Sequence, residues 1–125
     1  MMKKTEEIAC IYRPKIDDID RRLVALLNER AEIAIKVGEI KHQNKMRVHD
    51  PLREKQVIEK LENHNESVYP AQFGKESLIS NKSLKQIIKL VIRSCKKAEK
   101  ESVVILKKKD AKQDKKDRAK KKKKL

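Results

Sequence analysis

The sequence is poor in the residues that sheets, turns and disulfide scaffolds require. Its 125 residues include no Trp, two Tyr, one Phe, two Gly and three Pro. The chain also shows no alternating strand pattern, whereas apolar residues recur every three or four positions over long stretches. So few aromatic and turn residues argue against a sheet protein and predict an all-helical one.

Cysteines and long apolar runs are scarce as well. Cys10 and Cys95 form neither a CxxC pair nor a metal-binding spacing, which fits a reduced cytosolic protein better than a secreted disulfide scaffold. The opening residues, MMKKTEEIACIY, lack the apolar core of a signal peptide. No stretch approaches the length of a membrane span. We therefore expect a cytoplasmic protein with no metal site.

Charge is abundant and unevenly placed. Charged residues make up 42% of the chain, and the formal net charge is +15. Residues 107–125 alone carry 12 basic and three acidic residues, a net charge of +9. This segment has no aromatic residue on which bases could stack. We expect a helical domain over 1–106 and a Lys-rich, disordered tail over 107–125, which favours a solubilising role over a weak contact with nucleic acid.

Three helices account for the apolar periodicity. The first is long, spans 14–43 and carries an apolar stripe from Ile16 to Ile40. Asp50 followed by Pro51 is a strong helix start, since Asp caps the first turn and proline needs no donor there. The remaining segments are a connector at 44–48, a second helix from Asp50 to about Glu62, a loop at 63–79, and a third helix from near Ser80 past Glu99 that 102–106 can extend.

Several charged residues stand in or beside the apolar stripes. Arg30 and Lys41 are eleven residues apart, about three helical turns, and therefore share a face. Glu54 continues the stripe of the second helix, and Glu99 borders that of the third. Burying unpaired ions is costly, so these charges need partners. With Arg53 nearby, cations are in excess, which predicts an anionic ligand whose carboxylates bind to forked guanidinium donors.

Arg13 cannot easily join that cluster within one chain. It precedes Arg30 by seventeen residues, about 25 Å of helix and about 100° around the axis. It could reach the corresponding pocket of a second chain packed antiparallel to the first.

In series, these segments resemble a known family. "RPKIDDIDRRLVALLNERAEIAIKVGEIK" and "VHDPLREKQVIEKL" are similar to the all-helical class of chorismate mutase over about residues 13–62. The similarity continues more loosely over 84–100. The resemblance implies an all-α, three-helix chain with a long first helix that forms an intertwined homodimeric helical bundle. It also implies two sites per dimer and no cofactor.

The resemblance assigns roles on the long helix. Arg13 matches the arginine donated across the dimer. Arg30 and Lys41 match residues that bind the substrate carboxylates, and the lysine also reaches the ether oxygen.

Further site residues are implied on the other two helices. Asp50, Arg53 and Glu54 match the second-helix set, with Glu54 and the Asp50 backbone near the substrate hydroxyl. Cys95 falls where many relatives have Ser, and Glu99 where they have Gln or Glu.

The implied reaction explains the choice of residues. Chorismate rearranges to prephenate, in the shikimate route to phenylalanine and tyrosine, without a nucleophile or metal. The enzyme holds a flexible dianion in its reacting conformer and stabilises charge on the breaking ether oxygen. Arg30, Lys41 and Glu99 are the expected catalytic residues. Only a protonated Glu99 could donate to the ether oxygen. We therefore expect activity to fall as pH rises past neutrality, and Glu99→Gln to flatten the fall.

Three alternatives stay open. A lyase that removes pyruvate from isochorismate would use nearly the same carboxylate-binding residues. A basic helical nucleic-acid-binding protein would act through the tail. A structural dimerisation module would pair its inward charges with one another.

Overall fold

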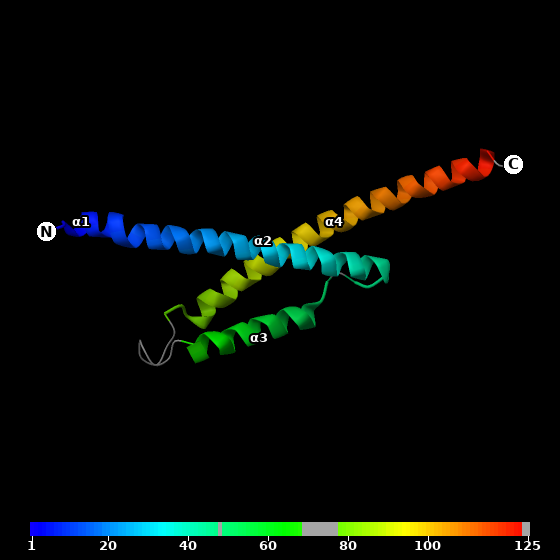
Figure 1. The fold of residues 1–125 in the computed structure, drawn as a ribbon. Coiled ribbons are helices and arrows are strands. Elements are labelled where there is room, and N and C mark those ends of the chain that lie inside the picture. The colour runs from blue at the N-terminus through cyan, green and yellow to red at the C-terminus, as the bar shows by residue number, and fades with distance from the viewer. Residues whose placement is uncertain (48, 69–77, 124–125) are drawn as a thin grey trace.

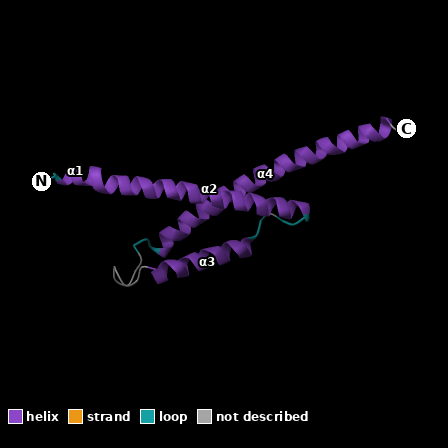
Figure 2. Cartoon of the chain, in the orientation of Figure 1, coloured by secondary structure: helices purple, strands orange, loops and turns teal. Residues whose placement is uncertain are grey.

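The computed structural model describes residues 1–47, 49–68 and 78–123. All regular structure in these ranges is helical, which confirms the prediction of an all-α chain (Figure 2). None of these described helices is both long and apolar enough to cross a membrane. The elements are α1 (Lys4–Glu7), a π-helical turn (Ile8–Tyr12), α2 (Arg13–Gln43), α3 (Pro51–Val68) and α4 (Asn81–Lys123).

The long helix α2 matches the predicted span closely but is preceded by more helix. In the π-helical turn, the Arg13 amide donates to the Ile8 carbonyl, five residues back. Pro14 stands in the first turn of α2 and has no N–H to continue a regular ladder. The wider turn accommodates the proline ring, so the chain stays helical back to Lys4.

Helix α3 begins as predicted and ends later than predicted. The Asp50 carboxylate accepts the Arg53 amide at 3.0 Å, which caps the first turn. The predicted end near Glu62 is wrong, because α3 continues to Val68.

The polar residues that suggested a loop from 63 onward instead join α3 to α4. The Asn65 amide donates to the Ile79 carbonyl at 2.8 Å, and the Asn81 amide donates to Glu66 at 2.6 Å. Residues 69–77 of the predicted loop lie outside the described part of the chain.

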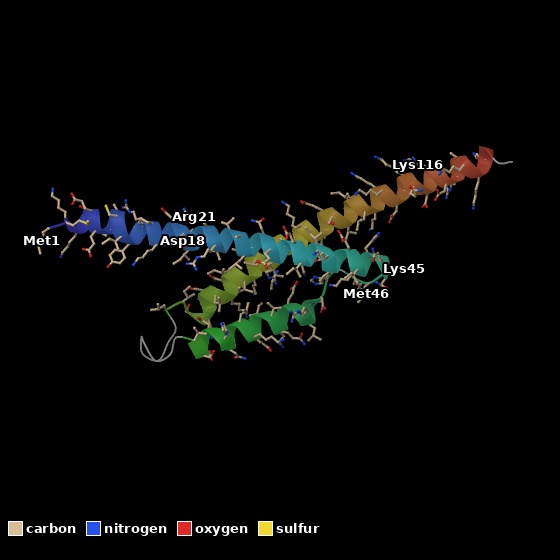
Figure 3. All side chains as sticks on the ribbon, in the orientation of Figure 1. Met1, Asp18, Arg21, Lys45, Met46 and Lys116 are labelled. Atoms are coloured by element: carbon tan, nitrogen blue, oxygen red, sulfur yellow. The ribbon has the colours of Figure 1, made fainter. Side chains whose placement is uncertain are left out.

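Helix α4 starts near the predicted residue and is far longer than predicted. The Ser80 hydroxyl accepts the Ser83 amide at 3.2 Å, and the helix runs for 43 residues to Lys123. The segment 107–123, expected to be disordered, is therefore helical in the structure. Lys, Ala and Gln are good helix formers, and Gln113 donates to Asp117 one turn later. Lys116 lies on this projecting end (Figure 3).

The packing is open. Helix α4 crosses α2 and also packs on α3, while the first half of α2 and the end of α4 project in opposite directions (Figure 1). Few of the residues whose burial is described are buried: Gly38 on α2 and Ile92, Cys95, Glu99 and Val103 on α4. The projecting half of α2 leaves Ile16, Ile19 and Leu23 more than half exposed.

Candidate active site

A cavity of about 310 Å³ lies where α2, α3 and α4 meet. This volume is at the lower end of the range for small-molecule sites, about 300–1,000 Å³. Seven of the eight predicted site residues line it: Arg30, Lys41, Asp50, Arg53, Glu54, Cys95 and Glu99. Apolar walls separate these polar groups: Ile33, Ala34, Val37, Val57 and Ile92.

Helix α2 supplies two cations to the cavity. Arg30 and Lys41 are both partly buried, and their spacing of eleven residues places them on one face. They are separated by about 16 Å along the helix axis. Between them, Ala34 and Val37 form the floor on the same face. A ligand lying along α2 would therefore meet a cation near each end.

The start of α3 supplies acidic and basic groups together. Asp50 is held by its capping bond to the Arg53 amide, so the first turn of α3 fixes the backbone beside Arg53 and Glu54. The Glu54 carboxylate forms an ion pair with Lys96 of α4. The Lys96 ammonium also lies 2.7 Å from Nδ1 of His49.

Lys96 lines the cavity and was missed by the sequence reasoning. A signal was available, because Lys96 stands three residues before Glu99 and therefore shares a helix face with it. The signal was obscured because Lys96 is followed directly by Lys97, and consecutive lysines are typical of a solvated surface.

Helix α4 places a nearly buried acid against α2. Glu99 is 6% exposed, and in the described part of the chain its Oε1 has no hydrogen-bond partner. Gly38 of α2 makes the room for it, since a Cβ at that position would overlap the Glu99 side chain. Cys95 is 5% exposed and lies one turn earlier on the same helix.

Arg13 is the predicted site residue that the structure does not bring to the cavity. It is exposed at the far end of α2 and is not among the residues that line the cavity. Among the described residues, His, Cys, Asp and Glu form no group that could hold a metal ion.

The described cavity thus joins two arginines, two lysines and three acids with apolar walls, across three helices. The model of the family "Chorismate mutase type II" matches residues 12–100. The chain belongs to the chorismate mutase type II family. The match covers α2, α3 and the part of α4 that lines the cavity, and leaves the end of α4 beyond Lys100 outside it.

Named relatives agree with this assignment. The chain is 38% identical over 88 residues to a bifunctional chorismate mutase/prephenate dehydratase from Aquifex aeolicus, covering 70% of this chain and 23% of the relative. It is 39% identical over 61 residues to a chorismate mutase from Methanocaldococcus jannaschii, covering 49% and 58%. A bifunctional chorismate mutase/prephenate dehydratase from Buchnera aphidicola is 29% identical over 82 residues, covering 66% and 19%.

The chain thus spans less than two thirds of the length of each of these chorismate mutase relatives. No solved structure matches the chain.

Proposed function

We propose that this protein is a cytoplasmic chorismate mutase that converts chorismate to prephenate on the way to phenylalanine and tyrosine. The observation that supports it most is the convergence of Arg30, Lys41 and Arg53 on one cavity with apolar walls. A compact dianion with a hydrophobic ring fits such a cavity in charge and in size. Membership of the chorismate mutase type II family supports the same reaction.

The reaction needs positioning and electrostatics rather than a covalent step. In the proposed mechanism Arg30 and Arg53 hold the substrate carboxylates through forked hydrogen bonds, which favours the compact reacting conformer. Lys41 and a protonated Glu99 donate to the ether oxygen as its bond to carbon breaks and charge accumulates there.

The substrate hydroxyl is assigned to the start of α3. Glu54 accepts its hydrogen bond beside the Asp50 backbone, and Cys95 contributes a weak thiol donor to a carboxylate.

The assay follows the loss of chorismate absorbance and identifies the product. Wild type should form prephenate, and Arg30→Ala should lose at least about 100-fold in kcat/KM, as expected for a desolvated charge contact. Arg22→Ala is the matched control, because Arg22 is exposed on α2 and pairs with nearby Asp18 at 3.3 Å. Absence of prephenate with wild type would refute the proposal. Pyruvate release from isochorismate would favour the lyase instead.

We also propose that two chains form an intertwined homodimer in which Arg13 completes the site of the partner chain. The exposed apolar stripe on the first half of α2 supports this arrangement, since a second copy would cover it. Mixing inactive Arg13→Ala and Arg30→Ala chains tests it. In a mixed dimer one site keeps both arginines, so random pairing should restore about one quarter of the wild-type activity. If the mixture stays inactive, Arg13 does not act across an interface.

A second candidate function concerns the end of α4. Asp110, Asp114 and Asp117 share one face, and Asp110 lies 3.3 Å from His42 of α2. The opposite face is mainly basic, with Lys108, Lys112, Lys115 and Lys122. Such a stripe, without large apolar residues, suits a weak electrostatic contact with nucleic-acid phosphates.

Fluorescence anisotropy with duplex DNA tests this contact. Affinity should fall with salt at a log–log slope of about −3.6 for four phosphate contacts. Replacing the four lysines by Gln should abolish binding, whereas Arg30→Ala should retain it. Absence of binding by the intact chain at low salt would refute this function.

A further inference from the structure

Lys96 occupies an unusual position for a surface-like lysine. Its side chain is 21% exposed and is ion-paired with Glu54, whose side chain is 30% exposed. It also lines the cavity beside Cys95 and Glu99. The ammonium group is therefore part of the cavity wall.

Two groups from the segment around the start of α3 hold this ammonium. One is Oε1 of Glu54, and the other is Nδ1 of His49 at 2.7 Å. A lysine has three donors, so it can serve both groups at once. The arrangement fixes Lys96 from two sides.

The charge of Lys96 also weakens the attraction of the Glu54 carboxylate for the other cations in the cavity. Glu54 shares the cavity with Arg30, Arg53 and Lys41. A carboxylate without its own cation would attract one of these groups and draw it away from an anionic ligand. Because Glu54 is paired with Lys96, it competes less with an anionic ligand for Arg30 and Arg53.

We propose that Lys96 is a positioning residue, which clamps the Glu54 carboxylate in the orientation that accepts the substrate hydroxyl. Lys96 acts through Glu54 and does not itself bind the substrate. This inference rests on the proposed mutase function for its effect on rate, but the clamp itself is a property of the folded chain.

A kinetic double-mutant cycle tests the effect on rate. Lys96→Met keeps the aliphatic stem against the cavity wall and should lower kcat/KM about tenfold, equivalent to about 1.4 kcal/mol. In a Glu54→Gln background the same change should alter kcat/KM less than about twofold. Lys97→Met, at the adjacent exposed position, should leave kcat/KM unchanged.

Two kinetic results would overturn the proposal. Full activity of Lys96→Met would show that the clamp has no effect. An equal loss in both backgrounds would make Lys96 a direct ligand of the substrate rather than a support for Glu54.

A second cycle is independent of catalysis. Urea unfolding of wild type, Lys96→Met, Glu54→Gln and the double variant should show a coupling of about threefold in the folding equilibrium constant, as for a partly exposed ion pair. Without such coupling the clamp does not exist, whatever the enzyme does. If coupling is found but wild type does not convert chorismate, the proposed function fails while the clamp stands.

Discussion

Gly38 controls how closely α2 approaches the side chain of Glu99, so replacing it should affect activity more than stability. The Cβ added by Gly38→Ala would overlap Cγ of Glu99 and lie 3.1 Å from both Cδ and Oε1. In an open helix this substitution stabilises the fold by about 1 kcal/mol. Overpacking costs about 1–3 kcal/mol. The free energy of unfolding should therefore fall by about 0–2 kcal/mol, which leaves a folded protein.

The catalytic effect should be larger, because the atoms in the way belong to the Glu99 side chain itself. The overlap is relieved when Glu99 rotates away from α2, and the rotated acid no longer points to the ether oxygen. Loss of one such donor typically costs about 10²–10³ in kcat. We therefore expect Gly38→Ala to lower kcat about 100-fold.

A double-mutant cycle separates this effect from general damage. Initial rates of chorismate loss are compared for wild type, Gly38→Ala, Glu99→Ala and the double variant, with circular dichroism as the check on folding. Because Gly38 acts through Glu99, the double variant should be no slower than Glu99→Ala. Wild-type kcat in Gly38→Ala, or the same factor in both backgrounds, would refute the reasoning.

Three further predictions concern Glu99, Cys95 and Leu23. Glu99→Gln should retain activity, because an amide N–H can donate to the ether oxygen; a loss as large as that of Glu99→Ala would contradict this role. Cys95→Ser should raise kcat/KM a few-fold, because a hydroxyl is the stronger donor to a carboxylate; a loss would make Cys95 an apolar packing residue. Leu23→Asp should convert the proposed dimer to inactive monomers in sedimentation experiments, because the charge would enter the stripe that a second copy is proposed to cover.

The helices were predictable where a local rule decides them. Apolar periodicity gave α2 within one residue of its observed start, and the Asp50 cap gave the start of α3. The end of α3 was missed, because Asn65 looks like a loop residue in the sequence. Its bond to the Ile79 carbonyl at 2.8 Å depends on where α4 begins, which no local pattern reveals.

The site residues likewise fall into those that a single helix reveals and those that depend on how the helices pack. Arg30, Lys41 and Glu54 could be found because charge on an apolar stripe is anomalous within a single helix. Lys96 was missed although it shares a helix face with Glu99, since it stands among other basic residues and becomes distinctive only when α3 packs on α4 and brings Glu54 to it. The close contact between Gly38 and the Glu99 side chain likewise could not be predicted, because it exists only where α2 and α4 cross.

The exposed stripe on α2 connects stability to the proposed site. Six apolar residues lie along it at 37–61% exposure: Ile16, Ile19, Leu23, Val24, Leu26 and Leu27. Burying the rest of each side chain is worth about 1 kcal/mol, hence about 12 kcal/mol for two copies. Bringing two chains together costs about 4–15 kcal/mol. The margin is small enough that one buried aspartate should abolish association. Arg13 lies on the same projecting segment, about 25 Å along α2 from Arg30. The contacts that would stabilise two associated chains would therefore also bring Arg13 of each chain to the site of the other. A lone chain would have neither the buried stripe nor the second arginine.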